Sequence, residues 1–299
     1  MGTGRTLIDH GPLIDARMDA LFGPAGTMGE FLFPFLLCVT GALVGSFAGA
    51  SALRIARGDS VVTGRSRCDS CGRVLHPADL VPILSFVALA GRCRTCRAPI
   101  DRLQLLAELS GAVIGGAAWL FMAGPLPAVF AALFGWQLLV LALSDWRSFH
   151  LPPAGIALLA GSALVLPLVK ALQGGAVFPL LLQQLAGAGL GYVLLAAPAL
   201  AFRALRGQDG MGSADPPLMA AIGAWAGVLG LCFIVLLAAA MGIAVALAMR
   251  LAGRIPDRPA SPGAKDESAP GSGEALPLGT LLSFGAITVT FAGFSLLTP

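Results

Sequence analysis

Charged residues are scarce in this chain of 299 residues. They make up 12% of it, whereas hydrophobic residues make up 57% and the mean hydropathy is +0.84. A chain with so little charge cannot cover itself with a water-facing surface of ordinary polarity, so a soluble globular protein is excluded. The formal net charge is only +3, which argues against a nucleic-acid partner. The composition predicts a protein of the lipid bilayer.

A cleavable secretory signal is also missing from the start of the sequence. Such signals have a short apolar core and a small-residue cleavage site, whereas residues 1–28 carry Asp9, Asp15, Arg17 and Asp19. We therefore interpret residues 1–28 as an external segment. Residues 29–53 are expected to form a first transmembrane helix that stays in the mature protein.

Long apolar runs fill most of the chain, and 39 glycines are available for close packing of membrane helices. We predict an all-α polytopic membrane protein with about eight transmembrane helices. One of the sixth and seventh spans should be short, tilted or broken, because together they have too few residues for two crossings of about 20 each. The eight candidate spans are 31–53, 103–123, 127–144, 154–172, 178–202, 218–230, 231–249 and 276–297.

Two segments are too polar for lipid. Residues 54–101 form a cysteine-bearing loop, and residues 254–275 have the composition of a flexible linker. If the N-terminus is external, sixteen of the 19 Lys and Arg residues lie on one side of the membrane. The positive-inside rule then predicts that the loop and the linker are cytoplasmic. Residues 102–253 would form the transmembrane core, and residues 276–299 the last transmembrane helix.

Four cysteines in the loop form two C-x-x-C pairs, Cys68 with Cys71 and Cys93 with Cys96. Two such pairs can supply four thiolates to one structural zinc ion, which predicts a small zinc-knuckle domain. The alternative is a pair of disulfides, but these are rare in a reducing cytoplasm. A closed site of four sulfurs leaves no position for water, so the metal is expected to be structural.

Two aspartates stand at the ends of apolar runs. Asp145 follows the run 127–144, and Asp215 precedes the run 218–230. Acids at such positions are functional candidates, and two of them can share a proton as in aspartic peptidases. The alternative for each is a helix cap or a pair with a local arginine such as Arg147. Glu108 is a third candidate, its alternative being a buried acid that joins helices.

Several blocks of the sequence resemble type IV prepilin peptidases. They occur in consistent order between residues 40 and 250, and the cysteine block with its Pro-x-x-Ser-Phe insertion is the most specific. The blocks are Gly45-Ser-Phe47, the two cysteine pairs, Pro82-Ile-Leu-Ser-Phe86, Glu108, Asp145 with Leu151-Pro152, and Gly210-Met-Gly212-Ser-Ala214-Asp215.

The resemblance implies a bifunctional enzyme of the bacterial inner membrane. Asp145 and Asp215 would cleave the leader of prepilins or pseudopilins at the cytoplasmic face, with Gly212 and Ala214 supplying backbone beside them. The new N-terminus would be methylated from S-adenosylmethionine, an activity that the family associates with the cysteine loop. The implied partners are these substrates and membrane lipid.

Three positions depart from the family pattern. Ala214 stands in place of a glycine, Pro217 in place of a lysine, and Pro153 in place of an acid. If the glycine normally takes a positive φ, alanine there costs on the order of 1 kcal/mol. Two other functions stay open at this point: a zinc-knuckle membrane scaffold without catalysis, and a peptidase without methyltransferase activity.

Overall fold

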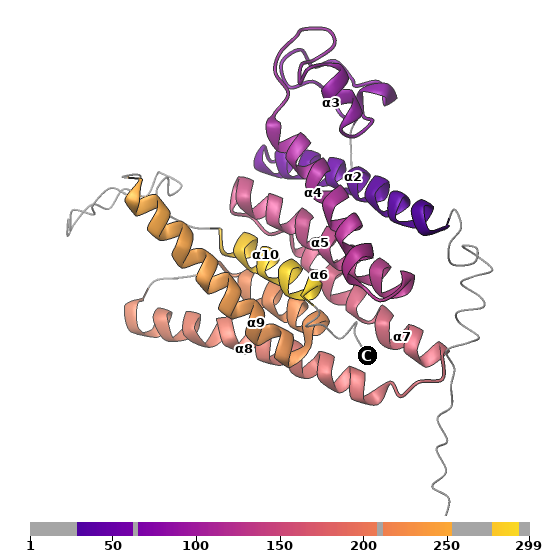
Figure 1. The fold of residues 1–299 in the computed structure, drawn as a ribbon. Coiled ribbons are helices and arrows are strands. Elements are labelled where there is room, and N and C mark those ends of the chain that lie inside the picture. Colours follow the sequence, from indigo (N-terminus) through magenta and orange to yellow (C-terminus); the bar gives the residue numbers. More distant parts are fainter. Residues whose placement is uncertain (1–28, 62–64, 208–211, 253–276, 293–299) are drawn as a thin grey trace, which may run out of the picture.

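The structure is a computed structural model that describes residues 29–61, 65–207, 212–252 and 277–292. The described chain is a bundle of helices without a strand, which confirms the predicted fold class (Figure 1). The expected external segment 1–28 and the whole of the expected linker 254–275 lie outside these ranges. The helices are α2 Gly29–Ala56, η1 Pro77–Asp79, α3 Leu84–Ala88, α4 Arg102–Phe121, α5 Pro125–Ser148, α6 Pro153–Ala163, α7 Val165–Leu172, α8 Phe178–Arg206, α9 Asp215–Leu251 and α10 Leu278–Phe291.

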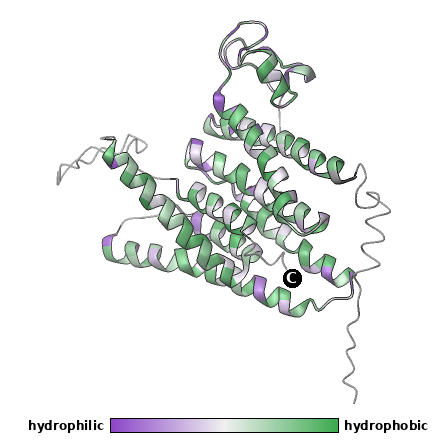
Figure 2. Cartoon of the chain, viewed as in Figure 1, coloured by the Kyte–Doolittle hydropathy of each residue, from purple (hydrophilic) through white to green (hydrophobic). Residues whose placement is uncertain are grey.

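Six helices in the described residues are long and apolar enough to cross a membrane: α2, α4, α5, α6 with α7, α8 and α9. Hydrophobic residues cover the bundle, whereas the cysteine loop carries more polar ones (Figure 2). A seventh apolar helix, α10, is shorter. The expected count of about eight is therefore approximate, and the difference comes from α9 and α10.

Helix α9 contains two helices joined at Gly227. This residue has φ 67° and ψ −178°, a combination that is open essentially to glycine alone. The sixth and seventh predicted spans are thus both present, but the break lies at Gly227 and not after Gly230. The break leaves a short first part that begins with Asp215 and a longer second part.

Glycines that face each other on neighbouring helices bring these helices into contact. Gly41 of α2 lies against Gly111 of α4, and Gly187 of α8 lies against Gly223 of α9. A Cβ atom at any of these glycines would collide with a carbonyl of the facing helix, so the backbones touch. Small residues at these positions give close packing without a hydrophobic driving force, as the composition predicted.

Helix α5 lies at the centre of the bundle, where its neighbours enclose it most completely. Phe134 of α5 stacks on Trp225 of α9 with ring centroids 5.0 Å apart. The indole N–H of Trp225 donates to the carbonyl of Leu159 in α6 at 2.9 Å. These contacts hold together α5 and α9, which carry the two aspartates, and α6.

The apolar run 154–172 forms two helices because of a proline. Pro167 has no N–H to donate to the carbonyl four residues earlier, that of Ala163. The chain changes from α6 to α7 at Leu164, and the freed Ala163 carbonyl accepts from Gln184 of α8 at 2.9 Å. A buried glutamine thus replaces the missing helical hydrogen bond.

The cysteine loop projects from the helical bundle and lies next to α2 and α4 (Figure 1). Arg147, near the end of α5, donates to Asp101 at 3.0 Å, and Asp101 also caps α4. The loop and the end of α5 that carries Asp145 therefore lie at the same end of the bundle.

Candidate active site and metal centre

Asp145 lies in the last turn of α5 and its side chain is buried. Its Oδ2 atom accepts hydrogen bonds from the backbone N–H of Thr280 at 2.8 Å and from the Thr280 hydroxyl at 3.1 Å. The neighbouring Arg147 pairs with Asp101 instead. Asp145 therefore meets α10, a helix far along the chain, and not the local arginine considered in the sequence.

Asp215 is the first residue of α9 and is also buried. A Cβ atom on Gly212 would lie 3.0 Å from its Oδ2 atom, so the Gly212 backbone lies against the carboxylate. Asp145 and Asp215 lie close enough for their carboxylates to interact electrostatically. The structure thus brings together the two aspartates and the Gly212 backbone.

The three departures from the family pattern are compatible with the local backbone. Ala214 has φ −89° and ψ −14°, a right-handed conformation that alanine adopts without strain, so the cost considered for a positive φ does not arise. Pro217 lies in the first turn of α9, and Pro153 is the first residue of α6. Prolines are tolerated at helix starts because those N–H groups have no intrahelical partner.

An apolar groove runs between α6, α8 and α9, with a volume of about 580 Å³. It reaches Ser213 and Ala214, which directly precede Asp215. Most of the residues that line it are alanines, whose small side chains would let another helix approach closely. The alanines of the lining are Ala157, Ala160, Ala188, Ala214, Ala220, Ala221 and Ala224.

The four loop cysteines converge on one point. Their sulfur atoms all lie within 4.8 Å of one another, and those of Cys68 and Cys96 are 3.7 Å apart. Four thiolates about 2.3 Å from a zinc ion would be roughly 3.8 Å apart along the edges of the tetrahedron. All six cysteines of the chain are free, so the disulfide alternative is not present. The donor set and its spacing fit a tetrahedral metal ion.

Both C-x-x-C pairs have the same backbone geometry. The N–H of Cys68 donates to the carbonyl of Arg73, and that of Cys93 to the carbonyl of Ala98. The residue after each pair has a positive φ, 69° at Gly72 and 60° at Arg97. Two equivalent turns therefore present their sulfurs to the same point.

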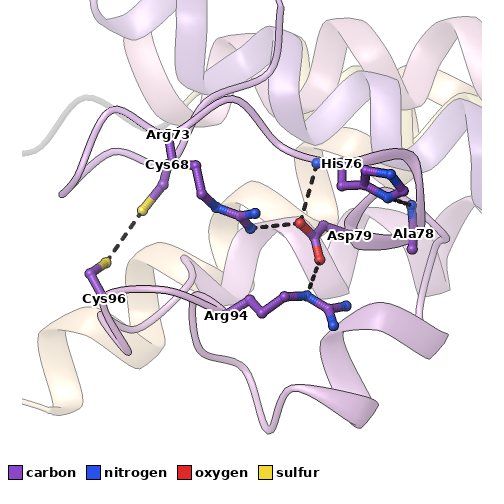
Figure 3. Close-up of polar contacts among 7 residues, drawn as sticks. All are labelled: Cys68, Arg73, His76, Ala78, Asp79, Arg94 and Cys96. Carbon is purple, nitrogen blue, oxygen red and sulfur yellow. Dashed lines mark hydrogen bonds and ion pairs between the residues drawn. The ribbon is translucent and has the colours of Figure 1, made fainter.

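Asp79 joins the two turns through arginines, as Figure 3 shows. Its carboxylate accepts from Arg73 at 2.6 Å and from Arg94 at 2.8 Å, while its side chain is only 4% exposed. Burial raises the pKa of Asp79, but the hydrogen bonds from Arg94 and Arg73 outweigh burial and hold the pKa below its usual range. The ionised Asp79 thus links the first cysteine pair to the second without a metal.

The thiols of the second pair are unlike one another. Backbone N–H groups of Cys96 and Thr95 lower the pKa of Cys93 to about 6. The Ala98 N–H lowers the pKa of Cys96, but burial and the neighbouring sulfurs outweigh it and raise that pKa to about 11. The Cys93 thiolate therefore forms readily and opposes ionisation of Cys96, and a bound cation would favour the thiolate form of both.

Glu108 belongs to a separate polar cluster. Its carboxylate accepts from the backbone N–H of Ile83 at 2.7 Å and from Gln104 at 3.1 Å. The Gln104 amide also donates to the carbonyl of Ser46 in α2 at 2.9 Å. Among the described residues, the hydrogen bonds of Glu108 and Gln104 therefore join α4, α2 and the loop. This arrangement favours the structural alternative for Glu108.

Sequence reasoning missed Thr280 and Gly279. A signal was nevertheless present: α10 is preceded by Pro277, which offers no side-chain cap. The first N–H groups of a helix need partners, and without a local cap these must come from elsewhere in the chain. Here the partner is Asp145.

Two family models match the chain. One, described as the Bacterial Peptidase A24 N-terminal domain, matches residues 39–122, and the other, described as the Type IV leader peptidase family, matches residues 132–247. The first range holds the cysteine loop and Glu108, and the second holds both aspartates. Helix α10 lies beyond both ranges.

Several known proteins are similar over most of the chain, although no solved structure matches it. A prepilin leader peptidase/N-methyltransferase of Burkholderia pseudomallei (strain K96243) is 37% identical over 235 residues, 77% of this chain and 67% of that protein. One of Bacillus subtilis (strain 168) is 34% identical over 230 residues, 74% of this chain and 86% of that protein. One of Aeromonas hydrophila is 34% identical over 189 residues, 61% of each. Together with the two family models, these relatives establish that the chain belongs to the type IV leader peptidase family.

Proposed function

We propose that this chain is a membrane aspartic endopeptidase that cleaves the leader of type IV prepilins or type II secretion pseudopilins at the cytoplasmic membrane face. The observation that carries the proposal is the pair of buried carboxylates, Asp145 and Asp215, which come from different helices and lie near one another. The similarity to proteins named prepilin leader peptidase/N-methyltransferase supports the substrate class.

The reaction follows from two carboxylates that share one proton. The ionised one takes a proton from water as the water oxygen bonds to the scissile carbonyl carbon, and the protonated one gives its proton to the carbonyl oxygen. The carbon–nitrogen bond of the resulting diol then breaks as the first carboxylate passes its proton to the departing amine, and a diol hydroxyl returns a proton to the second carboxylate. Each aspartate is therefore needed in a different protonation state.

The apolar groove is the place that we assign to the substrate's hydrophobic segment. It is continuous with Ser213 and Ala214, so a helix in the groove would have its end beside Asp215. Its alanine walls permit the close backbone contact by which membrane helices associate. The scissile bond would then lie where the apolar segment meets the basic leader.

The cytoplasmic orientation rests on charge. The chain crosses the bundle in α4 and again in α5 between the loop and Asp145, which returns it to the side of the loop. The ion pair between Arg147 and Asp101 agrees with this path. The arginine-rich loop lies in the cytoplasm by the positive-inside rule, and both aspartates lie at that face.

We also propose that the loop binds a structural zinc ion and that the protein methylates the new N-terminus. Cys68, Cys71, Cys93 and Cys96 would hold the zinc, which would add a second link between the two turns that Asp79 already joins. S-adenosylmethionine would supply the methyl group to the amine that cleavage releases. The names of the relatives support this second activity.

A direct assay tests the proposal. The purified chain in detergent is incubated with a peptide that has a basic leader, a glycine and an apolar helix. The products are identified by mass spectrometry. We expect one cut directly after the glycine. A folded, monodisperse preparation that leaves the peptide intact would contradict peptidase activity and favour the scaffold alternative. Cleavage without methyl transfer from added S-adenosylmethionine would favour the peptidase that lacks the second activity.

A further inference from the structure

Helix α10 begins against Asp145. Thr280, its third residue, donates to Asp145 Oδ2 through both its backbone N–H and its hydroxyl, and both side chains are at least 95% buried. A Cβ atom on Gly279 would lie 3.1 Å from Oδ2 and 3.0 Å from a methyl carbon of Leu151. The lack of a side chain at Gly279 thus lets the backbone of α10 lie close to the carboxylate.

Asp145 acts as the cap of α10 although it is 135 residues away. The first N–H groups of a helix have no intrahelical partner and carry partial positive charge. A side chain directly before the helix usually accepts from them, but Pro277 provides none here. The start of α10 therefore depends on Asp145, and the orientation of Asp145 depends on α10.

The Thr280 hydroxyl can serve both protonation states of Asp145. It lies 3.1 Å from Asp145 Oδ2 and 3.0 Å from the carbonyl oxygen of Ala142. When Asp145 is ionised, the hydroxyl donates to the carboxylate. When Oδ2 is protonated, it can donate to the threonine oxygen, and the hydroxyl proton turns to the Ala142 carbonyl. A hydroxyl group suits this position because it can both accept and donate a hydrogen bond.

We infer that Thr280 is a positioning residue for Asp145, and that α10 completes the candidate active site. The inference rests on the proposed function. It adds a helix that lies outside both matched family ranges and assigns the role to one hydroxyl and one backbone N–H. Thr280 holds Oδ2 at a fixed position through the proton movements that peptide cleavage requires.

The test compares kcat and KM for leader-peptide cleavage among variants of α10. Thr280→Val keeps the shape and removes the hydroxyl, and we expect kcat to fall about tenfold to a hundredfold with KM changed less than about twofold. Thr280→Ser restores the hydroxyl and should return kcat to within about threefold of the original. Thr290→Val is the matched control, because Thr290 is buried in the same helix but donates only to the Ala286 carbonyl of its own helix. It should change neither constant.

A second variant covers the case in which Thr280→Val does not fold. Gly279→Ala keeps the hydroxyl but places a methyl group against the carboxylate, and it should also lower kcat without raising KM. Thermal unfolding of each variant measures the structural part of the effect. The inference is overturned if Thr280→Val and Gly279→Ala keep full kcat, or if Thr280→Ser remains as slow as Thr280→Val. Asp145→Asn is measured beside them: if it cleaves normally, the proposed function fails, whereas an inactive Asp145→Asn with a fully active Thr280→Val refutes the role of Thr280 alone.

Discussion

The two buried aspartates contribute one carboxylate each to the proposed mechanism. Asp145→Asn and Asp215→Asn should each abolish leader cleavage, because an amide can neither take the proton from water nor deliver one to the carbonyl. Since the pair acts as a unit, the double variant should be no slower than either single variant. Initial cleavage rates of the three proteins, at equal amounts of folded enzyme, measure this.

Asp69 provides the control for these substitutions. It is exposed in the cysteine loop and pairs with Arg57 at 2.6 Å, so Asp69→Asn should cleave at a nearly normal rate. Asp101 is less suitable, because it caps α4 and binds Arg147. If either aspartate variant of the pair kept more than about a tenth of the activity, a barrier change below roughly 1.4 kcal/mol, the shared-proton mechanism would be wrong.

Residues of the site differ in how visible they are in the sequence. Asp145 and Asp215 could be found because an acid at the end of an apolar run is unusual in itself. Thr280 was missed because Pro277 indicates only that the start of α10 lacks a local cap, whereas the hydrogen bond that supplies the cap joins residues 135 positions apart. Glu108 was found for the same reason as the aspartates, but only its contacts with Ile83 and Gln104 distinguish a joining role from a catalytic one.

At the scale of elements, the cysteine loop is the part whose structure we expect to depend most on a bound metal. Its two turns are held to each other by Asp79 and the cysteine cluster. The protein purified without chelators should contain about one zinc ion per chain, and replacing Cys68 and Cys71 together by serine should remove it. Elemental analysis by mass spectrometry measures the content. Cys232→Ser is the control, because Cys232 lies in α9 outside the cluster, and full zinc in the double variant would refute the site.

The groove between α6, α8 and α9 predicts a separate effect on substrate binding. Ala157→Leu would fill part of the groove, and KM for the leader peptide should rise about tenfold while kcat changes little. A second apolar groove between α9 and α10 provides the comparison. Ala240→Leu places the same side chain in that groove and should leave KM unchanged. Equal effects of the two substitutions would show that the first groove is not specific for substrate.

Elements were predictable where hydropathy alone decides them. The runs behind α2, α4, α5 and α8 are long, apolar and bounded by polar residues, so their spans follow from composition. The break in α9 was misplaced by a few residues because a run of apolar residues with four glycines does not reveal which glycine takes a positive φ. Similarly, the change from α6 to α7 at Leu164 depends on Pro167 and on the Gln184 amide that compensates for it.

At the scale of the whole molecule, the two proposed activities should be separable. Methyl transfer needs an amine held beside a sulfonium and has no use for an acid pair, so Asp215→Asn should still methylate a peptide from which the leader has already been removed. Incorporation of labelled methyl groups into that peptide measures the activity. The Cys68 and Cys71 double variant should show the reverse pattern. Loss of both activities in a well-folded Asp215→Asn protein would contradict separate sites.

The break at Gly227 also has a consequence for the surrounding lipid. The first part of α9, residues 215–226, rises about 18 Å as an α-helix, whereas the hydrocarbon core of a bilayer is about 30 Å thick. This part cannot reach water at both of its ends, and with Asp215 assigned to the cytoplasmic face the break at Gly227 lies at the depth of the acyl chains. A bilayer relieves such a hydrophobic mismatch by thinning locally. The thickness of the membrane thus acts on the short first part of α9, and through it on the position of Asp215 at the membrane face where the peptide bond would be cut.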